Sequence, residues 1–131
     1  MADLTKLVQA IYANFERGDV SSIVETFADD IRFVHSGGPD IPYAKDRHGK
    51  QAAAAFFGDL AESVDVSQFE VRKYVEQGDT VMAVGRWAGL ARSTGRAFES
   101  DWAMLWAFDS SKVKFYQAYE NTNAVAKAFA A

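Results

Sequence analysis

His35 is the side chain in this sequence best suited to acid–base chemistry near neutral pH. It ends a short stretch in which Ile31 and Phe33 alternate with Arg32 and Val34, the pattern of a strand with one buried face. If the alternation holds, His35 shares the inner face with Ile31 and Phe33. There it is either a general base or a core histidine that hydrogen-bonds to the backbone, and the sequence leaves both readings open.

Other side chains are suited to completing a ligand pocket around this histidine. Tyr12, Tyr43 and Tyr116 each carry a hydroxyl that can donate a hydrogen bond to a ligand carbonyl or be satisfied within the core. Large apolar side chains would form the wall of the pocket, or simply the core. These are Phe33, Phe57, Trp102, Met104 and Trp106.

Asp101 is the most conspicuous carboxylate of the predicted central strand. Strict alternation places it opposite Trp102, beside Glu99 on the outer face, where it meets solvent or a dimer partner. Only a β-bulge would turn it inward. Asp101 is therefore a secondary catalytic candidate.

A sheet predicted over residues 80–121 must position most of these side chains. It consists of three long antiparallel strands with tight connections at residues 93–95 and 109–111. The middle strand has large residues on one face and small ones on the other, which predicts a curved wall with helices on the large-residue face. The large-residue row is Phe98, Ser100, Trp102, Met104, Trp106 and Phe108, and the opposite row is Ala97, Glu99, Asp101, Ala103, Leu105 and Ala107.

Helical spacing predicts two helices before the first strand. The first covers residues 4–15, is capped by Asp3 and ends at Gly18. The second is short, is capped by Asp19 and extends to Phe27. A strand over residues 31–35 follows, and then an irregular loop over residues 36–48 that either folds inward as a lid through Tyr43 or is an ordinary surface crossover.

The remaining elements complete an α+β order. A third, alanine-rich helix begins at Gly49 and carries an apolar face as far as Val64. A strand over residues 69–75 leads through a hairpin at 77–80 into the sheet, so four strands meander, and a short helix around residues 125–129 ends the chain. This order predicts helices packed against a strongly curved antiparallel sheet, with an apolar interior deep enough for a small molecule.

Composition sets the outer bounds. The 131 residues, 49% hydrophobic, suit one domain over residues 1–131 with its own core. A net charge of −4 without a basic run argues against a nucleic-acid surface. The chain has no cysteine and only two histidines, so a dedicated metal site has little support. It has no apolar stretch near the roughly 18 residues of a membrane helix and no signal-peptide pattern, so we expect a cytoplasmic protein.

Several short motifs occur in order along nearly the whole chain. They are Tyr12-x-x-Phe15-x-x-Gly18-Asp19, Phe27-Ala28-Asp29-Asp30, Gly49 before an alanine-rich helix with Phe56-Phe57, Thr94-Gly95-Arg96, and Tyr119-Glu120-Asn121-Thr122. In these the chain resembles the SnoaL-like and ketosteroid-isomerase-like group of the nuclear-transport-factor-2-like superfamily. The resemblance implies a cone-shaped, cystatin-like α+β barrel, in which a mostly antiparallel sheet wraps around N-terminal helices. This fold hosts several kinds of enzyme and also plain binding modules.

The catalytic positions of two such enzyme groups are not retained. Where ketosteroid isomerases have an oxyanion-hole tyrosine and two aspartates, the matching residues are Ile11, with Tyr12 one residue on, His35 and Met104. The resemblance therefore argues against ketosteroid isomerisation by that mechanism. Limonene-epoxide-hydrolase-like proteins have an Arg-x-Asp pair and a further aspartate, and only the arginine is matched here.

The same resemblance implies two further catalytic candidates. Arg86 matches the arginine, whereas Ala88 and Ala118 replace the aspartates, which disfavours that water-activating chemistry. Arg86 and Glu120 would both face the pocket from neighbouring strands. They would take part in catalysis or neutralise each other as a buried pair.

Two functions follow, and the sequence does not decide between them. In one, the cone binds a small apolar carbonyl or polycyclic substrate and acts as a cofactor-free isomerase, cyclase, hydrolase or dehydratase through acid–base chemistry. In the other, it is a non-catalytic ligand-binding or dimeric assembly module. We expect a homodimer in either case, because Ala97, Ala103, Leu105 and Ala107 form an outer row too apolar to face water comfortably.

Overall fold

The computed structural model describes residues 3–130 and confirms the predicted α+β fold. The elements follow one another as α1 (Leu4–Glu16), α2 (Val20–Glu25), β1 (Phe27–His35), β2 (Asp46–His48), α3 (Lys50–Ser63), β3 (Val64–Gln77), β4 (Thr80–Ala91), β5 (Ala97–Asp109), β6 (Lys112–Glu120) and α4 (Thr122–Phe129). Strands β3 to β6 form the predicted meander, and the whole sheet has the order β2-β1-β6-β5-β4-β3. Among the strands of residues 3–130, the pairing of β1 with β6 is parallel and the others are antiparallel.

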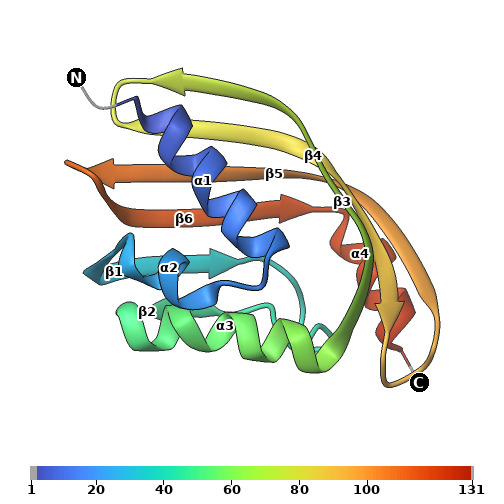
Figure 1. Ribbon diagram of the computed structural model, residues 1–131. Coiled ribbons are helices and arrows are strands. Elements are labelled where there is room, and N and C mark those ends of the chain that lie inside the picture. Colours follow the sequence, from blue (N-terminus) through green and yellow to red (C-terminus); the bar gives the residue numbers. More distant parts are fainter. Residues whose placement is uncertain (1–2, 131) are drawn as a thin grey trace.

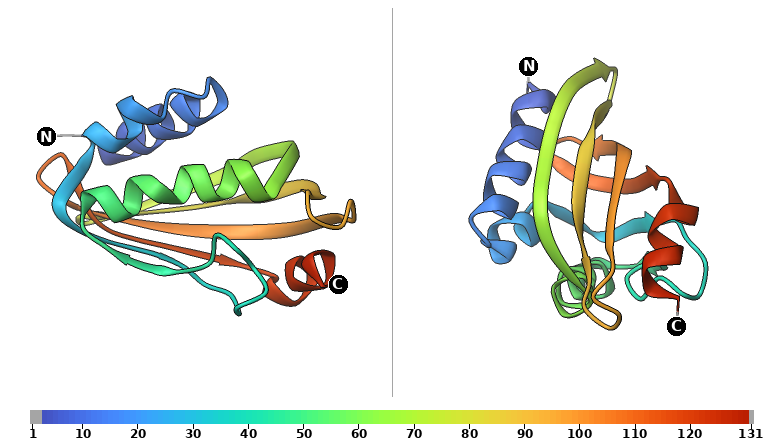
Figure 2. Two further views of the ribbon diagram at one scale, coloured as in Figure 1. Left: turned by 90° about the horizontal axis from the view of Figure 1, so that it is seen from below. Right: turned by 90° about the vertical axis from the view of Figure 1, so that its right-hand side faces the viewer.

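The sheet is strongly curved and does not close (Figure 1). Figure 2 shows α1, α2 and α3 together on one face, while α4 lies at the end where the β4–β5 hairpin turns. The core fills the space between these three helices and the sheet. Its fully buried large side chains come from both layers, from the loop after β1 and from α4, and they include Val8, Ile23, Phe27, Ile31, Phe33, Tyr43, Val81, Val113 and Val125.

The N-terminal helices begin and end as their local sequences predict. Asp3 accepts a hydrogen bond from the Lys6 amide, and Asp19 accepts one from the Ser22 amide, so both aspartates are N-caps. Gly18, just after α1, has a φ of 74°, a conformation that costs glycine little. The chain can therefore reverse between the two helices.

Three boundaries differ from the sequence-based prediction. Phe27 begins β1 instead of lying on the second helix, and the strand continues through the expected turn at Asp29 and Asp30, where its register with β6 shifts. Val64 begins β3 instead of ending α3. Asp46–His48, inside the predicted irregular loop, forms a short edge strand on β1. In each case pairing with a distant strand satisfies the backbone and outweighs the local pattern.

Strand β5 has the two faces that its alternation predicts. Phe98, Ser100, Trp102 and Trp106 are buried, whereas Glu99 is exposed on the opposite face. The pairing with β4 is regular from Thr80 to Leu90, so no bulge disturbs the alternation there. The irregularity in β5 comes later, between Ala107 and Phe108 in the pairing with β6.

Candidate functional site

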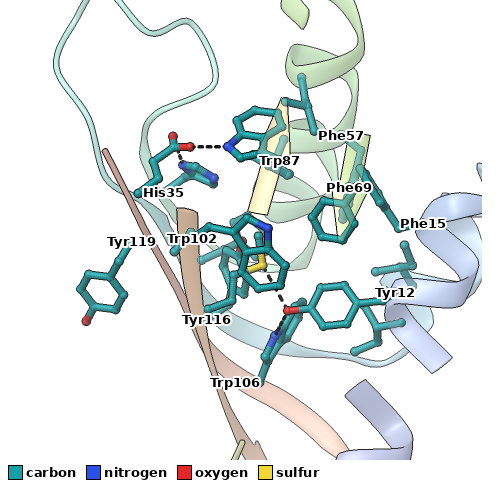
Figure 3. A pocket seen from close by; sticks show the side chains of 18 residues that line it. Tyr12, Phe15, His35, Phe57, Phe69, Trp87, Trp102, Trp106, Tyr116 and Tyr119 are labelled. Carbon is teal, nitrogen blue, oxygen red and sulfur yellow. Dashed lines mark hydrogen bonds and ion pairs between the residues drawn. The ribbon is translucent and has the colours of Figure 1, made fainter. Parts of the chain in front are cut away.

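A cavity lies between the helices and the inner face of the sheet (Figure 3). The volume of the cavity is about 60 Å³. A cavity needs roughly 10–15 Å³ of such volume to hold one water, so this one has room for a few waters or one small compound. It is lined by Ile11, Tyr12, Phe15, Ile23, Phe33, His35, Phe56, Phe57, Leu60, Phe69, Trp87, Trp102, Met104, Trp106, Tyr116, Ala118, Tyr119 and Glu120.

His35 and Glu120 meet at one end of this cavity. Strands β1 and β6 run parallel, and His35 is in register with Ala118, so Glu120 projects from the same face two residues further on. His35 Nδ1 lies 3.8 Å from Glu120 Oε2, and the two side chains are only 5% and 3% exposed. The alternation predicted for β1 is thus correct, and it brings the one buried histidine against a buried carboxylate.

Two hydrogen-bond donors hold Glu120 in place. The Tyr43 hydroxyl donates to Oε2 at 3.0 Å, and the Trp87 indole N–H donates to Oε1 at 2.9 Å. Burial raises the pKa of Glu120, and these two hydrogen bonds lower it in part. The result is a carboxylate of fixed orientation that is more basic than a glutamate in water.

Burial has the opposite effect on His35 because its charged form is the protonated one. Burial lowers the pKa of His35 to about 4; a backbone hydrogen bond at Ser36 raises it, and the charge of Arg47 lowers it further. The imidazole is therefore neutral at pH 7. Its ring stacks on Phe56, with centroids 5.3 Å apart, and meets Tyr43 edge-on. Nδ1 has no hydrogen-bond partner among the described residues.

Tyr12 provides a second polar group further along the cavity. Its hydroxyl accepts a hydrogen bond from the Trp106 indole N–H at 3.0 Å and donates one to Met104 Sδ at 3.2 Å. A thioether sulfur is a weak acceptor, so a ligand oxygen would compete for this proton. Burial raises the pKa of Tyr12, which keeps the hydroxyl protonated.

The structure places Arg86 and Asp101 away from the cavity. The two residues are in register on β4 and β5 and form an ion pair at 3.0 Å on the outer face. Arg86 also contacts Glu99 at 2.9 Å. The pocket-facing position implied for Arg86, and its neutralising contact with Glu120, are therefore wrong. Asp101 lies outside as strict alternation predicts, because no bulge turns it inward.

The other sequence-predicted ligand-binding residues do gather at the cavity. Phe33, Phe57, Trp102, Met104, Trp106 and Tyr116 line it together with Tyr12. Tyr43 is fully buried and reaches the site through its bond to Glu120. The loop over residues 36–45 does fold inward, as one of the two readings predicted.

Sequence reasoning missed Trp87 and Arg47. Trp87 shares the inner face of β4 with the buried Val81 and Ala83, so the alternation of residues along this strand could have identified it. Matching Arg86 to a family motif pointed instead to the opposite face of the strand. Arg47 is buried in the short strand β2, where it donates to Asp59 at 2.6 Å. Nothing in the sequence around Arg47 indicates that burial.

Among residues 3–130, no cluster of three or more histidine and acidic side chains is arranged to hold a metal ion. None of the helices described there is both long and apolar enough to cross a membrane.

Comparisons with known proteins identify the family. The model of the SnoaL-like domain matches residues 8–116, and the chain belongs to this family. A search of curated proteins gives no match. Among solved structures, an NTF2-like protein from Burkholderia xenovorans LB400 is 32% identical, with a TM-score of 0.88 over 97% of this chain and 95% of that one.

Two further structures share the fold. An NTF2-like protein from Burkholderia thailandensis E264 is 27% identical, with a TM-score of 0.89 over the whole of both chains. A protein with a ketosteroid isomerase-like fold from Catenulispora acidiphila DSM 44928, in complex with trimethylamine, is 16% identical, with a TM-score of 0.76 over 93% of this chain and 90% of that one. These likenesses confirm the fold and the SnoaL-like, ketosteroid-isomerase-like resemblance of the sequence.

Proposed function

We propose that the protein binds a small, mainly apolar carbonyl compound in the cavity and moves a proton on it, with Glu120 and His35 acting together and without a bound cofactor. The observation that carries this proposal is the contact between two buried titratable side chains at one end of an otherwise apolar cavity. Paired groups whose pKa values are shifted by burial are typical of acid–base sites.

The shifted pKa values assign the roles. A carboxylate with a raised pKa is a better base than an ordinary glutamate, and Glu120 takes the proton from the carbon next to the carbonyl. The electron pair of that C–H bond moves toward the carbonyl oxygen and forms an enolate. In a β,γ-unsaturated carbonyl compound the double bond shifts into conjugation with this enolate, and return of the proton to the γ-carbon completes an isomerisation. His35, neutral beside Glu120, lies 3.8 Å from the carboxylate and can take up or return a proton during the step.

The size of the cavity favours a monocyclic or short-chain ligand over a polycyclic one. A space of about 60 Å³ for water-sized molecules does not admit fused rings unless the aromatic lining moves apart. Trimethylamine in the protein from Catenulispora acidiphila is a ligand of the smaller kind. It supports small-molecule binding by this fold, not a particular chemistry.

The alternative is a module that binds a ligand without changing it. It is favoured by the hydrogen bonds that Tyr12 already makes within the protein, because they leave few groups free to act on a substrate. For either function we propose a homodimer through the outer face of the sheet. Exposed Val84, Leu90 and Tyr119 lie there with the half-buried Ala103 and Leu105.

Deuterium exchange into a ring ketone tests the catalytic proposal without knowledge of the natural substrate. Cyclohexanone in D₂O exchanges its α-protons by way of the enolate, and proton NMR measures the rate. The protein should accelerate this exchange, and Glu120→Gln should reduce the acceleration about a hundredfold or more. Glu99→Gln, on the exposed outer face, is the matched control and should keep the full rate.

Glu120→Asp and a fold check complete the design. Glu120→Asp keeps the charge but withdraws the carboxylate by one methylene, so it should also be slow while circular dichroism shows an intact fold. Equal acceleration by the protein and by Glu120→Gln would refute Glu120 as the base, and no acceleration by the unmodified protein would leave the binding module as the function.

A further inference from the structure

The three tryptophans of the chain all line the cavity, but their indole N–H groups are not equally used. Trp87 donates to Glu120, and Trp106 donates to Tyr12. The Nε1–H of Trp102 is buried and has no acceptor among residues 3–130. An indole nitrogen is a donor only, and buried donors are normally paired in folded proteins.

The position of Trp102 is fixed by its surroundings. Its ring stacks on Phe69 with centroids 5.1 Å apart and planes only 4° apart. On β4 its partner in register is Gly85, where a Cβ atom would stand 2.5 Å from the indole carbon Cζ2. The residue is 4% exposed, so rotation cannot bring the N–H to bulk solvent.

Trp102 also stands directly opposite the proposed base. Trp102 and Glu120 are partners in register on β5 and β6, so their Cα atoms are about 5 Å apart and both side chains enter the cavity. A ligand in the cavity therefore has both the Trp102 N–H and the Glu120 carboxylate among its lining groups. Figure 3 shows the Trp102 ring in the middle of the lining side chains.

We propose that Trp102 is the hydrogen-bond donor that selects the ligand, and that the ligand presents a neutral acceptor oxygen, a ketone or aldehyde carbonyl, to its Nε1–H. This inference rests on the proposed function of the cavity and names the group that binds the substrate oxygen. Tyr12 is less suited to the task, because its proton already has an acceptor in Met104.

Charge and size narrow the class of ligand. A carboxylate or phosphate at Trp102 would lie beside buried Glu120 and be repelled when that group is ionised. A ligand ammonium or amide N–H at this point would face the Trp102 N–H, so two hydrogen-bond donors would meet without an acceptor. A five- or six-membered ring ketone, with its oxygen on Trp102 and its α-carbon toward Glu120, satisfies both side chains and suits the volume of the cavity.

Two ligands of nearly the same shape distinguish the effect of a hydrogen bond to Trp102 from the effect of packing. Cyclohexanone carries the acceptor oxygen, and methylenecyclohexane replaces that oxygen with a CH₂ group. The three indole N–H signals of the ¹⁵N-labelled protein are recorded during titration with each, and the Trp102 signal is assigned by its loss in Trp102→Phe. Cyclohexanone should move the Trp102 signal downfield and methylenecyclohexane should not, while the Trp87 and Trp106 signals move less.

Affinity gives a second readout. Trp102→Phe keeps an aromatic ring on Phe69 but removes the N–H, so it should weaken cyclohexanone about five- to tenfold and leave methylenecyclohexane unchanged. If Trp102→Phe does not fold, the Trp102 signal is assigned as the one that remains in both Trp87→Phe and Trp106→Phe, and its shift in the unmodified protein decides. An equal response to both ligands would overturn the assignment of Trp102 even if proton exchange is catalysed. A Trp102 response without catalysed exchange would support this assignment and refute the catalytic proposal. Binding of neither ligand would refute both.

Discussion

At the scale of single residues, the environment of His35 has a consequence for stability as well as for catalysis. The folded protein holds its pKa at about 4, against 6.5 for an ordinary histidine, and burial is the main cause. The unfolded chain therefore binds a proton at a higher pH than the folded one does. The contribution of His35 to the unfolding free energy is fully present above about pH 6.5 and is lost as the pH falls toward 4.

This loss can be isolated with His35→Phe. The variant keeps a ring on Phe56 but cannot titrate, so between pH 7 and pH 4 it should lose up to about 3 kcal/mol less stability than the unmodified protein. Urea unfolding at several pH values measures the difference. The comparison matters because Glu120 changes stability in the opposite direction over part of this range. Identical pH profiles for the two proteins would mean that His35 is not held neutral.

At the scale of elements, the approach of β4 to the Trp102 ring depends on one glycine. A Cβ atom at Gly85 would lie 1.9 Å from the Glu70 carbonyl oxygen as well as against the indole. Gly85→Ala should therefore destabilise the protein by about 3 kcal/mol and weaken ligand binding, because overpacking displaces Trp102. Gly58→Ala, on the exposed side of α3 with nothing within 4 Å, is the control and should stabilise by about 1 kcal/mol. Thermal unfolding of the two variants makes the comparison. Equal stability would show that Trp102 is not confined by Gly85.

The sequence was also most informative about the helices and strands taken one at a time. Alternation along β1 and β5 correctly placed His35 inside and Asp101 outside, because no bulge shifts either strand at those residues. The parallel pairing of β1 with β6 is what brings His35 to Glu120, and no local pattern specifies it. The hydrogen bonds of Tyr43 and Trp87 to Glu120 join positions 77 and 33 residues apart, which lie beyond local reasoning for the same reason.

At the scale of the whole molecule, the outer face of the sheet leaves apolar side chains uncovered. Tyr119 is 45% exposed, Leu90 39% and Val84 37%, around a patch of small and aliphatic residues. We expect light scattering to give the mass of a dimer at micromolar concentration. Leu105→Glu should shift it to monomer by placing a charge in the interface, whereas Ala55→Glu, exposed on α3, should not. A monomer before any substitution would refute the proposed dimer.

The central claim is that a buried Glu120, made more basic by its surroundings, removes a proton from a ligand in the cavity. The pH dependence of deuterium exchange into cyclohexanone tests it most directly. With the unmodified protein the rate should rise as Glu120 ionises, at a pH above the ordinary 4.5 of a glutamate, because burial raises its pKa. No second step is expected near pH 6.5, since His35 stays neutral there. A rate that rises at or below pH 4.5, or a profile that Glu120→Gln reproduces, would contradict the account.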